Sequence, residues 1–112
     1  MKITKKVDDY GTVRYTNEQG KLHREDGPAR EYANGDKFWC INDKLHREDS
    51  PAIEWADGSK EWWINGKRHR EDGPAIEYAD GYKEWWLNDI EYSEQEFNNY
   101  ILRKRLQRIM EL

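Results

Sequence analysis

Gly20 to Asn42 reads GKLHREDGPAREYANGDKFWCIN, and the next two segments repeat this pattern almost letter for letter. Asp43 to Asn65 reads DKLHREDSPAIEWADGSKEWWIN, and Gly66 to Asn88 reads GKRHREDGPAIEYADGYKEWWLN. Self-similarity at this 23-residue period is typical of a stacked array, in which each unit buries its apolar side chains against its neighbours. Such chains present a long, regular surface and usually act by binding.

The composition favours a thin, ordered and soluble domain. Charged residues make up 38% of the 112, but the six Trp and seven Tyr each bury a large area. The net charge is −4 with both signs interspersed, which argues against nucleic-acid binding through a basic field. The lone Cys40 cannot form an internal disulfide, and no apolar run follows the first charged residues. We therefore predict a cytoplasmic protein.

A hairpin turn is predicted in the middle of each unit, at Asn34-Gly35, Asp57-Gly58 and Asp80-Gly81. These dipeptides accept positive φ at both central positions, as a two-residue type I′ turn requires. A three-residue turn would shift the register and mix the two faces of the sheet.

The two-residue turn assigns each side chain to a face. It sets Ile53 opposite Trp62, and side chains alternate along a strand. The residues predicted to form the core face are Ile53, Trp55, Trp62 and Ile64, with Ile76, Tyr78, Trp85 and Leu87 in the third unit and Tyr32, Trp39 and Ile41 in the first.

The opposite face supplies the candidate binding site. Aromatic side chains are enriched at binding hot spots, and rows of acidic groups favour a basic protein partner. The candidate partner-binding residues are Phe38, Glu54, Glu61, Trp63, Glu77, Tyr82, Glu84 and Trp86. The alternative is that the junction loops fold back over these rings and give a two-sided core.

The HREDGP or HREDSP segment connects one unit to the next. Its proline, such as Pro51, is predicted at the start of each hairpin's first strand. Asn65-Gly66 could start another tight turn and make residues 67–70 a third strand. Three full strands would reverse every other unit, so we predict two strands plus an ordered loop in each.

No catalytic residue, metal or cofactor is predicted. His23, His46 and His69 recur at one register, whereas a metal needs several ligands that converge on one point. Each imidazole is therefore predicted to bond a neighbouring loop. Cys40 is predicted to be a small apolar filler on a strand.

The two ends of the array differ from its middle. Residues 9–19 resemble a degenerate half-repeat, with Gly11 as the turn and Tyr15 where the other units have Trp. Ser93 and Glu96 form a capping box that predicts a helix from about residue 94 to the C-terminus. The side chains predicted to close the sheet edge are Phe97, Tyr100 and Ile101.

Another apolar stripe follows on the predicted helix, on a face of its own. It is predicted to bind a second copy of the chain or a partner helix. The stripe consists of Leu102, Leu106, Ile109 and Met110.

The predicted fold is mainly β: a single-layer antiparallel β-meander or solenoid of 23-residue hairpin repeats with a C-terminal helical cap. Residues 1–19 form the half-repeat, 20–88 the three repeats and 89–112 the cap.

Gly58 to Gly66, which reads GSKEWWING, resembles the MORN-type β-hairpin repeats. The HREDGPA-like junction marks a variant found in phage and viral repeat proteins. The resemblance covers about residues 20–88 and implies an elongated scaffold or adaptor without catalytic residues. We therefore expect a non-enzymatic protein-binding module, encoded by a phage or virus, that engages or inhibits a protein in the host cytoplasm.

The alternative function comes from another class. The basic helix 102–110 and the exposed aromatics could bind nucleic acid or compete with it. The balanced charge makes nucleic acid and membranes unexpected partners.

Overall fold

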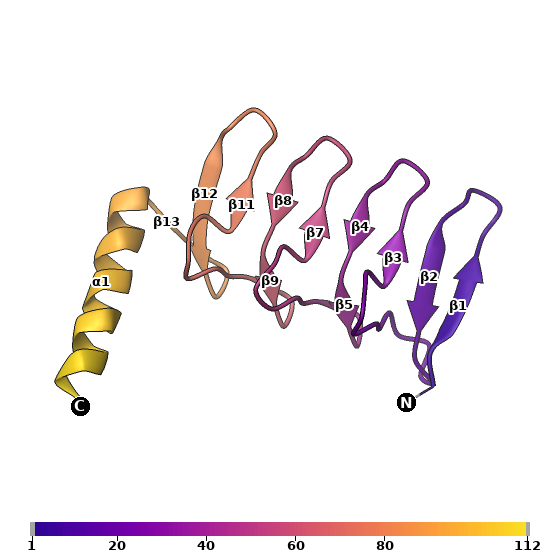
Figure 1. The fold of residues 1–112 in the computed structure, drawn as a ribbon, viewed down its shortest axis with the longest axis horizontal. Coiled ribbons are helices and arrows are strands. Elements are labelled where there is room, and N and C mark those ends of the chain that lie inside the picture. The colour runs from indigo at the N-terminus through magenta and orange to yellow at the C-terminus, as the bar shows by residue number, and fades with distance from the viewer. Residues whose placement is uncertain (1, 112) are drawn as a thin grey trace.

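The computed structural model describes residues 2–111 and shows a row of β-hairpins with a helix at one end (Figure 1). The molecule measures 53 × 35 × 19 Å along its principal axes, so the sheet is a single layer. Neighbouring strands are antiparallel throughout, which confirms the predicted meander. Within the described residues, the main sheet runs in the order β1 (Thr4–Val7), β2 (Val13–Thr16), β3 (Arg30–Glu31), β4 (Lys37–Phe38), β7 (Ile53–Glu54), β8 (Lys60–Glu61), β11 (Ile76–Glu77), β12 (Lys83–Leu87) and β13 (Ile90–Tyr92).

Each of the first two repeats folds into two hairpins, where we predicted one hairpin and a loop. A long hairpin enters the main sheet, and a short hairpin follows it at the lower edge in Figure 1. The short hairpins pair β5 (Cys40–Ile41) with β6 (Lys44–Leu45), and β9 (Trp63–Ile64) with β10 (Lys67–Arg68). The prediction of two strands plus a loop was wrong because two hairpins contain an even number of strands, so every unit keeps its direction. In the third unit β12 runs through both positions and pairs with β13.

The two kinds of turn lie at different dipeptides from those predicted. In the long hairpin, the Trp55 N–H donates to the Ser59 carbonyl at 2.9 Å and the Gly58 N–H donates to the Trp55 carbonyl at 3.0 Å. Gly58 has a φ of 96°, which matches a three-residue loop that ends on a left-handed glycine. The two-residue turn is at Asn65-Gly66, whose φ values are 50° and 78°.

This loop length changes the register of the long hairpins. Ile53 pairs with Glu61, and Glu54 pairs with Lys60, so the predicted pairing of Ile53 with Trp62 is wrong. Paired residues share a face of the sheet. We call the face that carries Ile53 and Glu61 the aromatic face, and the face that carries Glu54 and Lys60 the junction face.

The junction loops fold back over the junction face and cover an aromatic ring of the preceding unit. The Arg47 guanidinium carbon lies 3.9 Å from the centre of the Trp39 ring, and Arg47 Nη1 donates to Glu54 at 3.0 Å. A guanidinium on an aromatic face is a favourable arrangement, and here it joins two successive units. The same stack recurs between Arg24 and Tyr15 at 4.0 Å and between Arg70 and Trp62 at 3.7 Å.

The N-terminal hairpin is more complete than predicted. Its strand β1 begins at Thr4, within the predicted half-repeat of residues 1–19 but before the segment 9–19 whose pattern resembled the repeats. The loop has the same hydrogen bonds as the repeats, with Asp8 N–H donating to Thr12 and Gly11 N–H donating to Asp8. The stack of Arg24 on Tyr15 confirms that Tyr15 takes the place of the repeat tryptophan.

The junction histidines fix the short hairpins, as predicted. The Nδ1 atom of His46 accepts a hydrogen bond from the Asn65 N–H at 2.9 Å. Nδ1 can accept only when it carries no proton, so the neutral imidazole is protonated at Nε2. The equivalent pairs are His23 with Asn42 at 3.1 Å and His69 with Asn88 at 3.0 Å.

The helix α1 (Glu94–Met110) begins with the predicted capping box. Ser93 Oγ accepts from the Glu96 N–H at 3.1 Å, and the Glu96 carboxylate accepts from the Ser93 N–H at 2.8 Å. Phe97 and Ile101 are buried against Leu87, as predicted, while Tyr100 is exposed. The predicted end of the helix at the C-terminal residue lies outside the described residues. Within residues 2–111, no helix is long and apolar enough to cross a membrane.

Candidate protein-binding face

On the aromatic face, a glutamate of each of the last two repeats holds two aromatic side chains. Glu61 accepts from the Trp55 indole at 2.7 Å and from the Trp63 indole at 3.0 Å. Glu84 accepts from the Tyr78 hydroxyl at 3.1 Å and from the Trp86 indole at 2.8 Å. These bonds restrict the orientation of all four rings. The acidic groups that we predicted to be free for a partner are therefore already partly used within the chain.

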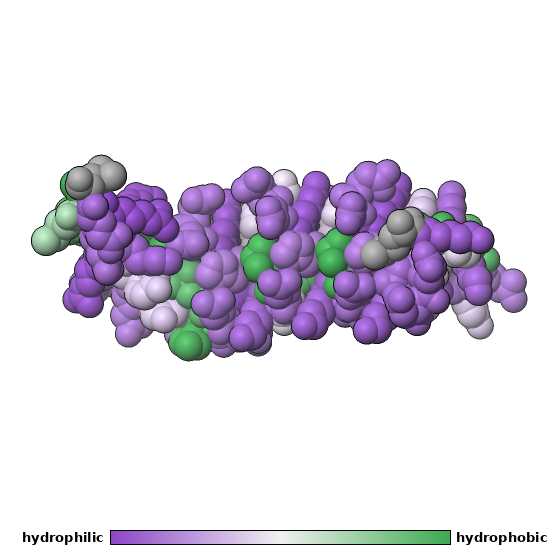
Figure 2. Space-filling model, turned by 90° about the horizontal axis from the view of Figure 1, so that it is seen from below, coloured by the Kyte–Doolittle hydropathy of each residue, from purple (hydrophilic) through white to green (hydrophobic). Residues whose placement is uncertain are grey.

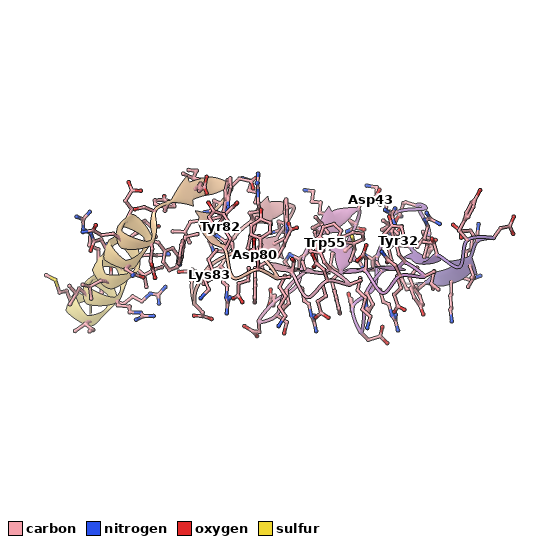
Figure 3. The ribbon with its side chains drawn as sticks, turned by 90° about the horizontal axis from the view of Figure 1, so that it is seen from above. Tyr32, Asp43, Trp55, Asp80, Tyr82 and Lys83 are labelled. Atoms are coloured by element: carbon pink, nitrogen blue, oxygen red, sulfur yellow. The ribbon has the colours of Figure 1, made fainter. Side chains whose placement is uncertain are left out.

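In the first repeat a phenylalanine takes the place of this glutamate. The Phe38 ring meets Tyr32 edge to face at 5.5 Å and meets Trp55 in the same way at 5.4 Å. Edge-to-face pairs at this separation are favourable. Phe38 thus fills the space between the aromatic residues of two successive hairpins. Figure 3 shows Tyr32, Trp55 and Tyr82 spaced along the length of the molecule.

The structure divides the predicted partner-binding residues between the two faces. The register places Phe38, Glu61 and Glu84 on the aromatic face, and their hydrogen bonds bring Trp63 and Trp86 to it. Tyr82 lies beside Tyr78, with ring centres 5.6 Å apart.

Glu54 and Glu77 lie on the junction face, so their assignment to one face with Glu61 was wrong. They pair across strands with Lys60 and Lys83, and Glu77 also accepts from Arg70 at 2.7 Å. Because each of these two carboxylates lies beside a basic side chain, they add little net negative charge to the junction face.

Trp63 and Trp86 are half-buried, but the junction loops do not cover them. Those loops lie on the opposite face, and it is Arg68 from the short hairpin that stands between the two rings. The Arg68 guanidinium carbon is 3.8 Å from the centre of the Trp86 ring and 5.4 Å from that of Trp63. Its Nε donates to Asp89 at 3.2 Å. The sequence marks this role, because Arg68 replaces the leucine of the earlier repeats.

Three residues of this face, Tyr32, Trp55 and Tyr78, were predicted to belong to the core. Tyr32 and Trp55 are half-buried, and Tyr78 is 41% exposed. Tyr82 beside it is 61% exposed. The pattern of a glycine in third position of a short loop could have located them, since it is typical of the three-residue turn. Apart from Tyr10 in the N-terminal loop, the most exposed aromatic side chains of the sheet are therefore Tyr78 and Tyr82, near the loop of the third repeat.

A shallow groove of about 440 Å³ opens between Trp55 and Tyr78. Its polar lining includes the carboxylates of Asp36, Asp57 and Glu61, and no lysine or arginine among the described residues lines it. Hydrogen bonds from the backbone and hydroxyl of Ser59 hold the pKa of Asp57 below its usual value. Partial burial, together with the hydrogen bond to Glu84, raises the pKa of Tyr78. At neutral pH the groove therefore combines aromatic walls with negative charge.

The edge of the molecule that carries the short hairpins has a different character. Figure 2 shows it as largely hydrophilic, with hydrophobic side chains in separate spots along its length. This edge offers no continuous apolar surface in that view. The aromatic face is therefore the better candidate for a binding surface.

The apolar stripe of the helix lies in solvent. Its four side chains are between 51% and 85% exposed. The helix is held to the third junction by Lys104, whose ammonium lies 3.2 Å from Glu71, and this hydrogen bond lowers the pKa of Glu71. The residues of the exposed stripe are Leu102, Leu106, Ile109 and Met110.

The thiol is buried, and the three histidines accept hydrogen bonds from backbone N–H groups of the chain. Cys40 is buried, and burial raises its pKa to about 11, so the thiol is protonated at neutral pH and is a poor nucleophile. Within residues 2–111, no three side chains of His, Cys, Asp or Glu form a group that could hold a metal ion.

Comparison of the chain with protein-family models, with curated proteins and with solved structures gave no match.

Proposed function

We propose that this chain is a non-enzymatic protein-binding module that contacts its partner through the aromatic face. The observation that carries the proposal is the row of aromatic side chains that successive hairpins place on one open face of a single-layer sheet. Aromatic residues supply most of the energy at many protein interfaces. Since hydrogen bonds already restrict several of these rings, binding would order few side chains and would lose little entropy.

The chemistry of the face favours a basic protein surface as its partner. Glu61 and Glu84 lie among the rings, and their carboxylates can accept further hydrogen bonds. We also propose that a phage or virus encodes the chain and uses it on a host protein. The support for this origin is the resemblance of the repeats to the MORN-type variant.

Replacing both Tyr78 and Tyr82 with alanine is expected to weaken binding of the partner at least about tenfold, because exposed rings at the centre of an interface carry much of its affinity. The partner is first captured on the immobilised chain from a lysate and purified. Surface-binding measurements then compare wild type with the double variant. Lys37→Ala on the junction face is the control, and we expect it to bind like wild type.

Equal affinity of the double variant and wild type would move the site away from the aromatic face. The same assay with duplex DNA and with RNA tests the alternative function. Tight binding that falls steeply with salt would support nucleic acid as the partner and would contradict our proposal.

The exposed stripe of the helix leads to a separate prediction about assembly. We propose that it pairs with the stripe of a second copy or with a helix of the partner, since an exposed apolar stripe at helical spacing generally marks an interface. Sedimentation of wild type is expected to show a dimer, and Leu106→Asp is expected to shift it to the monomer. If both sediment as monomers, the stripe does not join two copies.

A further inference from the structure

We propose that the groove between Trp55 and Tyr78 receives an arginine side chain of the partner protein. This inference rests on the proposed function, since it names the group that the aromatic face would recognise. It begins with a difference between otherwise equivalent positions of the repeats. Phe38 in the first unit corresponds to Glu61 in the second, because both pair with Ile53 across neighbouring strands.

The exchange of phenylalanine for glutamate explains why the groove lies in this position. Between Tyr32 and Trp55, the Phe38 ring contacts both neighbours and fills the space. Between Trp55 and Tyr78, the smaller Glu61 leaves a hollow that its own side chain helps to line. The result is a site with two aromatic walls and a negative charge between them.

The charge of the lining selects a cation. Asp36, Asp57 and Glu61 all contribute to the groove, and the described residues place no basic side chain there. The other grooves near the junctions each contain an arginine of this chain, such as Arg47 or Arg70. The groove between Trp55 and Tyr78 thus resembles these grooves in its aromatic and acidic lining, but no arginine of the described residues lines it.

Elsewhere in the molecule, the cation that occupies a site made of an aromatic ring and a carboxylate is arginine. Arg47 stacks on Trp39 and bonds to a carboxylate, and Arg68 stacks on Trp86 and bonds to Asp89. A planar guanidinium can stack on a ring while its edge donates to carboxylates, which the compact lysine ammonium cannot do. The Glu61 carboxylate accepts two indole hydrogen bonds and retains lone pairs for a guanidinium.

The test uses the full chain and a short peptide with blocked ends whose only charged residue is a central arginine. Nuclear magnetic resonance follows the indole Nε1–H signal of Trp55 as the peptide is added. We expect a saturable shift of this signal with a dissociation constant on the order of 1 mM or below. Matched peptides with lysine or with citrulline, the neutral analogue of arginine, are expected to give a clearly smaller shift.

Three variants locate the interaction. Glu61→Gln removes the charge and is expected to weaken the arginine peptide about fivefold or more. Glu61→Phe fills the groove as Phe38 does and is expected to abolish the response of Trp55. Glu91→Gln changes the net charge by the same amount on an exposed residue outside the groove, and its binding should equal that of wild type.

The inference is overturned if the Trp55 signal does not respond, or if lysine and citrulline peptides shift it as much as arginine does. An equal loss in Glu61→Gln and Glu91→Gln would also overturn it, since the effect would then be one of net charge. Glu61→Gln keeps the size of the side chain, so it decides the question even if Glu61→Phe does not fold. If these tests fail while the Tyr78 and Tyr82 double variant still loses its captured partner, the protein-binding face stands and the arginine site does not.

Discussion

Replacing Trp62 with alanine is expected to lower the free energy of unfolding by about 3 kcal/mol, a large part of the stability of a domain this small. Trp62 belongs to the second repeat, and the Arg70 that covers its ring belongs to the third. In a repeat array each unit contacts only its neighbours, so the loss of this ring weakens the joint between two units. Thermal and urea unfolding of the purified variant measure the effect.

A matched control separates this joint from the general effect of removing a ring. Tyr82→Ala also removes an aromatic side chain, but that side chain is mostly exposed, so a change of no more than about 0.5 kcal/mol is expected. If Trp62→Ala unfolds as wild type does, the arginine–tryptophan stacks do not hold the units together.

The stack itself is measured by a double-mutant cycle. The unfolding free energies of wild type, Arg70→Ala, Trp62→Ala and the double variant together give the coupling between the two side chains. We expect this coupling to be about 1 kcal/mol because the ring is partly desolvated.

The features that depend on local patterns could be predicted from the sequence. The 23-residue period predicted a single-layer antiparallel meander, and Ser93 with Glu96 predicted the start of the helix. The recurrence of histidine at one register predicted bonds to neighbouring loops. Each of these follows from spacing within one unit or one turn of helix, so no knowledge of strand pairing was needed.

The register could not be predicted in this way, because two dipeptides in the same unit are compatible with the same turn. Asp57-Gly58 and Asn65-Gly66 both accept positive φ, but the first ends a three-residue loop and only the second forms the two-residue turn. A difference of one residue in a loop moves side chains between the faces of a sheet. Because of this difference, Glu54 lies on the junction face and not at the predicted site, whereas Trp55 lies on the aromatic face beside Glu61.

The junction arginines could not be placed from the sequence either. Arg24-Glu25-Asp26 and its repeats have the composition of exposed ion pairs, and nothing in the local pattern shows that each arginine reaches back over a ring of the preceding unit. This contact depends on the path of the whole junction loop. Trp63 and Trp86, by contrast, share a face with Glu61 and Glu84 because side chains alternate along a strand, and each indole bonds to the glutamate two residues earlier.

The second large effect is expected at the other end of the array, where Phe97→Ala should lower the free energy of unfolding by about 3–4 kcal/mol. The third repeat has no junction loop after it, and among the described residues no arginine stacks on Trp85 as Arg47 does on Trp39. Phe97 is only 4% exposed and packs on this end of the sheet together with Ile101. The helix thus takes the place of a following repeat.

Circular dichroism at the helical and aromatic bands, recorded during urea unfolding, measures this effect. Gln107→Ala is the matched control, because it shortens an exposed side chain of the same helix outside the apolar stripe and is expected to change stability little. A Phe97→Ala variant as stable as wild type would mean that the sheet does not need the helix at its end. Since a solenoid must close its terminal unit to bury that unit's apolar side chains, we expect instead that the helix and the third repeat unfold together, at a lower urea concentration than in wild type.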